Sequence, residues 1–256
     1  MKIFDTHIHT IFRPTHFFEI YRLMNVETVI SVAFYPVVPK YSETLEDLFR
    51  WIIERETQRL QFVNIACYCG IGIHPRSIPQ NLNANIYKTI EESIHLPEVV
   101  CLGEIGLETG TKEEIEVFER QLIIAEQNSN FPVILHTPGK NKREITKKMV
   151  EILESVNIRF GIIDHISPEN IDLAIDSGLY MGLTIQLGKL TIDNFLQIVR
   201  EYEYYANRFL INSDLGIDIA QKDTVPKAVT QMFKEGIDRG IIESIAYKNA
   251  IKLFKL

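Results

Sequence analysis

Residues 159–184, RFGIIDHISPENIDLAIDSGLYMGLT, hold a strand, a helix and a second strand in succession. The apolar segments 159–165 and 179–184 have the length and composition of strands. Between them, Ser167 followed by Pro-Glu predicts a helix that begins there, and Gly178 predicts its end. A strand, a helix and a strand in this order favour parallel pairing through a right-handed crossover.

The same alternation runs through the whole chain. Helical patterns separate the apolar segments, the longest over 42–59 and another over 113–128. Eight such units favour a (β/α)8 TIM barrel, a parallel eight-stranded barrel with outer helices, over the alternative of an open doubly wound sheet. The length of 256 residues is close to the roughly 250 of that barrel, and we predict one domain over residues 1–256. The strands are expected at 2–9, 28–34, 66–73, 99–104, 132–136, 159–165, 179–184 and 208–213.

Composition narrows the functional class. Hydrophobic residues make up 46% of the chain, yet polar residues interrupt every apolar stretch, so we expect no membrane helix. The absence of a secretion-type leader and three cysteines without zinc-knuckle spacing predict a cytoplasmic, reducing location. A net charge of −7 argues against a protein that coats nucleic acid. It does not exclude a nuclease, because bound cations and a local basic patch can offset the charge at one site.

The first predicted strand ends in Asp5-Thr6-His7-Ile8-His9. Because side chains alternate along a strand, His7 and His9 are expected to face one side, together with Asp5. Two imidazoles that face one space form a chelating pair.

Four further predicted strands end in a residue that can bind metal: Glu104, His136, His165 and Asp214. In a parallel barrel all these ends lie on one face, where active sites are built. Ionisable groups so near a core are usually paired or bound to metal, which favours a metal site over unrelated polar caps.

Six ligands are too many for one tetrahedral zinc and suit two divalent ions about 3.5–4 Å apart. Glu104 lies in the middle of the strand order and is the expected bridge. Four imidazoles favour zinc, with manganese, iron, nickel or magnesium as alternatives. One ion is assigned to His7, His9 and Asp214, and the other to His136 and His165.

The chain resembles the TatD-related metal-dependent hydrolases of the amidohydrolase superfamily. The resemblance rests on Asp5 to His9, Gly72-Ile73-His74-Pro75, Gly103-Glu104-Ile105-Gly106-Leu107, Pro132 to His136, His165, Asp214, the segment 118–122 and the closing segment 249–254. It implies two divalent ions, a bridging glutamate and phosphodiester hydrolysis, often as a 3′ deoxyribonuclease.

The chain departs from the family where substrate contacts are expected. It has His74-Pro75-Arg76 where the family usually has His-Pro-His, and His136-Thr137-Pro138 where His-Thr-Arg is common. It has Asn212-Ser213-Asp214 in place of Glu-Thr-Asp. The metal ligands therefore carry over from the family more fully than the nucleic-acid contacts.

A mechanism follows from this ligand set. Two cations lower the pKa of a shared water, and Asp214 is expected to accept its proton as well as bind metal. His74 is interpreted as a substrate contact rather than a further ligand, with a hydrogen-bonded strand cap as the alternative. Arg76 and Lys140 are the candidates to hold an anionic substrate.

The remaining polar residues near the strand ends have supporting roles. Lys140, Lys142, Arg143, Lys147 and Lys148 form a basic run that could hold an anionic substrate together with Arg76, although a solvated helix face is the favoured interpretation of the lysines after Lys140. Asp164 is expected to be structural or to support a ligand, and Asp5 and Glu108 to orient ligands.

The leading hypothesis is a two-metal hydrolase of an anionic substrate, either single-stranded DNA ends or a small phosphodiester. A second is an amidohydrolase-type enzyme for a lactone, an amide or a small phosphate ester. A third is a barrel that keeps its metals for a structural or binding role. The sequence leaves the oligomeric state open.

Overall fold

The computed structural model describes residues 1–217 and 223–256. Its eight strands pair in parallel in sequential order, which confirms the barrel and rules out the doubly wound sheet. A parallel bridge between Ile8 and Leu215 joins the ends of the first and last strands. The strands are β1 (Ile3–Ile8), β2 (Val26–Val32), β3 (Ala66–Ile71), β4 (Val99–Gly106), β5 (Val133–His136), β6 (Gly161–Ile163), β7 (Tyr180–Thr184) and β8 (Phe209–Asn212).

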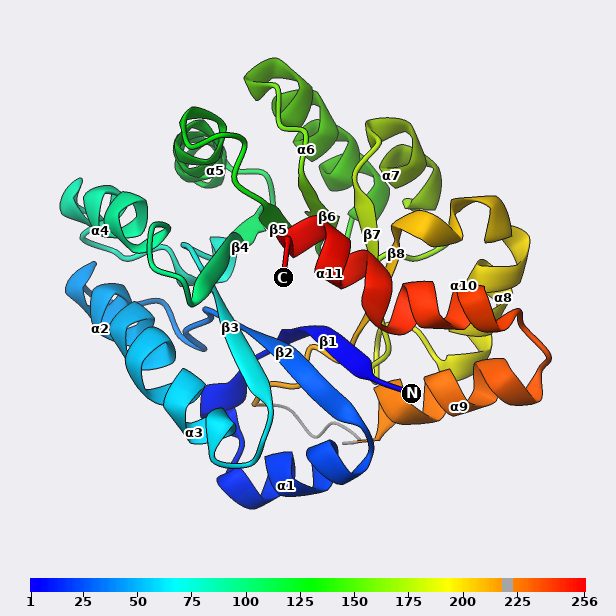
Figure 1. The fold of residues 1–256 in the computed structure, drawn as a ribbon. Helices are drawn as coiled ribbons and strands as arrows, with labels where there is room; N and C mark the ends of the chain where they lie inside the picture. The colour runs from blue at the N-terminus through cyan, green and yellow to red at the C-terminus, as the bar shows by residue number, and fades with distance from the viewer. Residues whose placement is uncertain (218–222) are drawn as a thin grey trace.

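Helices surround the strands on the outside (Figure 1). The predicted helix over 42–59 is the continuous run of α2 (Glu43–Trp51), η2 (Ile52–Glu56) and α3 (Thr57–Gln61). None of the helices within the described ranges is long and apolar enough to cross a membrane. The others are α1 (Thr15–Leu23), α4 (Asn85–Ser93), α5 (Lys112–Gln127), α6 (Lys142–Val156), α7 (Ile171–Ser177), α8 (Ile192–Glu201), α9 (Thr224–Lys234), α10 (Arg239–Glu243) and α11 (Asn249–Phe254), with short turns η1 (Thr10–Phe12), η3 (Pro75–Ser77), η4 (Glu203–Arg208) and η5 (Ser244–Lys248).

Local signals explain where these helices begin and end. The prediction that the helix after β6 begins at Ser167 is wrong, because the backbone N–H of Ser167 donates to Asn170 Oδ1 at 2.9 Å and closes a turn first. The helix α7 begins only at Ile171. Its predicted end is confirmed, since Gly178 caps it with a φ of +77°, a conformation that glycine adopts without steric cost.

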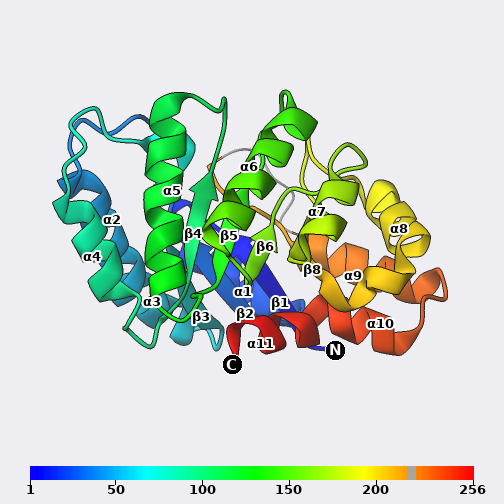
Figure 2. The same cartoon turned by 90° about the horizontal axis from the view of Figure 1, so that it is seen from above.

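The apolar core has two layers. The larger layer lies between the strands and the surrounding helices. The smaller fills the barrel interior, where Phe4, Ile134 and Leu210 meet Leu253 and Phe254 of α11. Figure 2 shows α10 and α11 at the end of the molecule that holds both termini. Apolar packing therefore seals the N-terminal end of the barrel, and the polar residues are left to the opposite mouth.

Candidate metal centre

The mouth of the barrel gathers the six predicted ligands. His7, Glu104 and His136 are strand residues, and the other three lie one or two residues past the end of a strand. All have their functional atoms within three overlapping groups of metal-ligand geometry, in which each atom lies within 4.8 Å of the others of its group. The groups are His7 with His9 and Asp214, His7 with Glu104 and His165, and His74 with Glu104 and His136.

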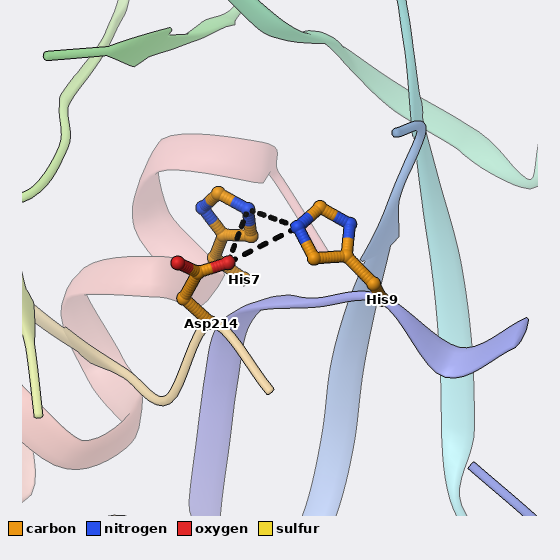
Figure 3. A group of neighbouring side chains, drawn as sticks. All are labelled: His7, His9 and Asp214. Carbon is orange, nitrogen blue, oxygen red and sulfur yellow. Dashed lines mark hydrogen bonds and ion pairs between the residues drawn. The ribbon is translucent and has the colours of Figure 1, made fainter. Parts of the chain in front are cut away.

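The first set of predicted ligands, His7, His9 and Asp214, lies where β1 and β8 adjoin. Figure 3 shows His7, His9 and Asp214 pointing toward one another. Asp214 Oδ1 lies 3.0 Å from His9 Nε2 and 3.5 Å from His7 Nε2. A backbone hydrogen bond of 2.8 Å from Asp214 N to His7 O holds the two segments together. These three side chains therefore offer one oxygen and two nitrogens to a single point.

The second set lies across the mouth, on β5 and beyond β6. Glu104 Oε1 is 2.7 Å from His136 Nδ1 and 2.9 Å from His165 Nε2. The other oxygen, Oε2, is 3.3 Å from His7 Nε2 and 4.0 Å from His9 Nε2. Glu104 thus turns one oxygen to each set, which is the geometry expected of a carboxylate between two cations.

Each imidazole is fixed through its other nitrogen. His7 Nδ1 is 2.6 Å from Asp164 Oδ2, and His9 Nδ1 donates to the carbonyl oxygen of Val32 at 2.8 Å. A proton held on Nδ1 leaves the Nε2 lone pair of each ring free for a metal ion. Asp164 therefore has the supporting role that was predicted for it.

The histidines of the second set are fixed in the same manner. His136 Nε2 is 2.7 Å from Glu108 Oε2, so Glu108 fixes the orientation of this predicted ligand. His165 Nδ1 is 2.8 Å from Thr184 Oγ1, whose hydroxyl in turn donates to Asp164. Because these hydrogen bonds use one nitrogen of each ring, the other nitrogens, His136 Nδ1 and His165 Nε2, face Glu104.

The pKa values follow the charge balance of this buried cluster. Burial favours the neutral form of Glu104, but the charges of His7 and His136 outweigh it and hold its pKa well below the usual range. Burial opposes a charge on His7 too, yet Glu104 and Asp214 raise its pKa well above the usual range. Burial, with the charge of Lys189, lowers the pKa of His165 to about 4, so this imidazole is neutral at pH 7.

The residues present fit divalent metal ions. In the metal-free protein the charges of His7, His136 and Lys189 balance the two buried carboxylates, and a metal ion would take over that role. Nitrogen with carboxylate oxygen is the donor set of zinc and other transition metals. His165 and Asp214 also have φ values of +56° and +46°. Residues other than glycine rarely adopt this left-handed conformation, and it is concentrated at functional sites.

His74 is buried at the centre, but its hydrogen bonds do not suit a ligand. Its Nδ1 accepts the backbone N–H of Arg76 at 2.9 Å, so the proton of the neutral ring lies on Nε2. This Nε2 has no hydrogen-bond partner and lies 3.5 Å from Glu104 Oε2. Burial holds the pKa of His74 well below its usual range, which keeps the ring neutral. It therefore presents an N–H donor to the centre.

The two predicted anion contacts are both exposed but differ in their contacts with the centre. Arg76 stands beside the centre, with its guanidinium 5.0 Å from the ring centroid of Phe34 and 3.9 Å from Glu108. Lys140 is exposed in the loop between β5 and α6, and no contact within the described residues links it to the centre.

One predicted orientation is wrong. Asp5 does not share a side with His7, because the pairing of β1 with β2 shifts between Asp5 and Ile8. The Asp5 carboxylate accepts the hydroxyl of Tyr21 on α1 at 2.6 Å and the backbone N–H of Ser213 at 3.0 Å. It therefore braces the segment that leads to Asp214 from outside the barrel.

Two lysines lie at the centre: Lys189, which was not singled out from the sequence, and Lys142, which was interpreted as part of a solvated helix face. Lys189, in the loop after β7, forms an ion pair with Asp214 and lies 3.1 Å from His165 Nδ1. Lys142 donates to the carbonyl oxygen of His165 at 2.9 Å, and burial with the charge of Lys189 lowers its pKa to about 8. The interpretation of Lys142 as part of a solvated helix face is therefore wrong. No metal-binding residue type ends β7, so the sequence offered no signal for Lys189 beyond its place in that loop.

Comparison with known proteins agrees with this geometry. The sequence profile described as TatD related DNase matches residues 4–255. An uncharacterized metal-dependent hydrolase of Methanocaldococcus jannaschii is 33% identical over 255 residues, which cover 98% of this chain and 99% of that protein.

One solved structure supports the same family, and a second shows the same fold. The crystal structure of a TatD-like protein from Archaeoglobus fulgidus superposes with a TM-score of 0.81 at 32% identity, over 99% of this chain and 100% of that one. An organophosphorus hydrolase from Deinococcus radiodurans has a TM-score of 0.69 over 99% of this chain and 92% of its own, but at 14% identity it shares only the fold. Since the profile and the archaeal relatives match nearly the full length, this chain belongs to the TatD-related DNase family.

Proposed function

We propose that the protein is a metal-dependent hydrolase that uses two divalent cations to cleave phosphodiester bonds, in single-stranded DNA ends or in a small phosphodiester. One observation carries the proposal. Glu104 directs Oε2 toward His7 and His9 and Oε1 toward His136 and His165. A buried carboxylate placed between two sets of imidazoles is what a bridging ligand requires.

The six predicted ligands would divide between two ions according to the strands that carry them. His7, His9 and Asp214, which form one group, would hold one ion. His136 and His165, which both face Glu104 Oε1, would hold the other, with Glu104 shared between the two ions. Four imidazole nitrogens favour zinc, and manganese, iron, nickel or magnesium are the alternatives that elemental analysis would distinguish. When bound, such ions activate water and neutralise charge on the phosphoryl oxygens.

Asp214 is the proposed proton acceptor. Its Oδ1 faces His9 at 3.0 Å, and the positive charges of Lys189 and His7 outweigh burial and hold its pKa well below the usual range. An ionised carboxylate can take a proton from the attacking water and return it to the leaving oxygen.

His74 would stabilise the transition state. Its Nε2–H is buried beside Glu104 without an acceptor, so it can donate to an oxygen on which negative charge develops. Arg76, held over Phe34 at the rim, would attract the anionic substrate, and Lys140 would add a flexible positive charge farther out.

The test combines elemental analysis of the purified protein with a substrate panel of p-nitrophenyl phosphodiesters, short single-stranded DNA, lactones and amides. We expect two metal ions per chain and turnover of the phosphodiesters, with DNA shortened from an end if DNA is the substrate. Turnover confined to lactones or amides would favour the second enzyme hypothesis. Full metal loading with no hydrolysis would leave a metal-holding structural or binding barrel.

The proposed location is the cytoplasm. Cys67, Cys69 and Cys101 are free thiols, and the latter two are buried. Free thiols suit a reducing compartment. Cell fractionation with an antibody to the native protein would test this, and recovery from an oxidising compartment would contradict it.

A further inference from the structure

Lys142 begins α6 and directs its ammonium group toward the mouth of the barrel. Its Nζ donates to Thr137 Oγ1 at 3.0 Å and to the carbonyl oxygen of His165 at 2.9 Å. Both acceptors are neutral. No carboxylate lies within ion-pair distance of Lys142 among residues 1–217 and 223–256, although the side chain is partly buried. A lysine withdrawn from solvent without a counter-ion is poised to bind an anion.

The position of Lys142 is fixed by its neighbours. The hydroxyl of Thr137 accepts from Lys142 and donates to the carbonyl oxygen of Asp164 at 2.8 Å. Two acceptors on different segments therefore hold the ammonium group, and its third N–H remains for a ligand. A donor held in place before binding loses little entropy when the ligand arrives.

This ammonium group adjoins the second set of metal ligands. Thr137 directly follows His136 in the sequence. The carbonyl oxygen of His165 accepts from Lys142, while the imidazole ring of the same residue faces Glu104. The ammonium group of Lys189 lies 3.1 Å from His165 Nδ1, but it already forms an ion pair with the carboxylate of Asp214. Of the two lysines beside the centre, Lys142 is thus the one whose positive charge has no carboxylate partner within the described residues.

We propose that Lys142, held by Thr137, forms an anion subsite that binds a phosphoryl oxygen of the substrate beside His165. This inference rests on the proposed function and deepens it, because it selects phosphate esters over neutral lactones and amides. An ammonium group forms both a hydrogen bond and an ion pair with a negatively charged phosphoryl oxygen, whereas a neutral carbonyl oxygen offers the hydrogen bond without the opposite charge.

The test uses two probes on the metal-loaded protein. Inorganic phosphate carries the oxygens that the subsite would bind, and acetohydroxamate binds metal ions without them. For Lys142→Met we expect phosphate affinity, measured by calorimetry, to fall about tenfold or more, with acetohydroxamate affinity unchanged. Lys147→Met, an exposed lysine on the same helix, is the matched control and should change neither.

Two results would overturn the subsite. One is phosphate affinity that stays at the level of the unmodified protein in Lys142→Met, and the other is a parallel loss of both probes, which would mean that Lys142 only supports the metal centre. Binding is measured without turnover, so failure of the proposed function is separable. If the unmodified protein hydrolyses no phosphodiester but Lys142→Met still loses phosphate affinity selectively, the anion subsite is supported and the proposed phosphodiesterase function is rejected.

Discussion

His7 Nδ1 lies 2.6 Å from Asp164 Oδ2, and both side chains are almost completely buried. The contact joins β1 to the segment after β6, so one ligand is oriented by a residue from the far side of the barrel. Burial favours the neutral carboxyl, but hydrogen bonding to His7 and the charge of His165 lower the pKa of Asp164 to about 2. An ionised carboxylate at this position strengthens the imidazole as a ligand.

Asp164→Asn should therefore weaken metal binding by about 10- to 100-fold, the usual effect of losing a carboxylate that orients a ligating histidine. Competition with a chromophoric chelator would measure it. Asp172→Asn, which removes an exposed ion pair with Arg143, serves as the control and should leave metal affinity unchanged. Equal metal affinity in Asp164→Asn and the unmodified protein would refute the role of Asp164.

Glu104→Gln should lower the metal content from two ions per chain to one or fewer. The substitution keeps the shape of the side chain but removes the charge shared between the two sets of histidines. Elemental analysis after dialysis measures the change, and Glu113→Gln on the exposed start of α5 is the matched control. Retention of both ions by Glu104→Gln would show that this carboxylate does not bridge them.

Asp214→Asn should reduce turnover by orders of magnitude while the metal content falls little. The amide keeps one oxygen toward His9 but cannot take a proton from water. Steady-state kinetics on the phosphodiester that the panel identifies, with metal analysis of the same sample, would separate the two effects. Turnover at the level of the unmodified protein would rule out Asp214 as the proton acceptor.

Much of the candidate centre could be predicted from sequence because each ligand lies at or just past the end of a strand. Barrel topology brings the ends of the strands to one face, independently of the loop conformations. His7 and Asp214 therefore meet although they are 207 positions apart in the sequence. The orientation of Asp5 could not be predicted in this way, because one irregularity in β1 pairing reverses the side that a residue faces. Strict alternation is a local rule, and only the paired neighbour strand reveals a break in it.

The roles of the two lysines could not be predicted for a different reason. Lys142, at the start of α6, and Lys189, in the loop after β7, reach the centre through long side chains whose contacts lie on segments distant in sequence. Lys142 is held by His165 rather than by its own helix, whereas Lys140, two positions earlier, remains exposed. A run of basic residues in the sequence indicates positive charge near the mouth of the barrel. It does not indicate which of these side chains contacts the centre.

His74→Leu, which leaves no hydrogen-bond donor at this position, should lower kcat about 100-fold or more and leave the metal content unchanged. The expected loss is that of one hydrogen-bond donor to the developing negative charge. The prediction depends on the Nδ1 atom of His74 being occupied by the backbone N–H of Arg76, which places the ring proton on Nε2. If metal content drops together with kcat, His74 is a ligand and the tautomer assignment is wrong.

Metal affinity should rise with pH across the neutral range. The pKa values of His7 and His136 are raised in the metal-free protein, because Glu104 and other nearby carboxylates outweigh the effect of burial. Both imidazoles therefore hold protons that a metal ion must displace, and affinity increases until the pH passes their raised pKa values. His165, with a pKa of about 4, has no proton to release at neutral pH. Calorimetry in two buffers of different ionisation enthalpy, between about pH 6 and 8, would count the protons released. Binding without proton release, or affinity that is flat over this range, would show that the metal-free centre is already deprotonated.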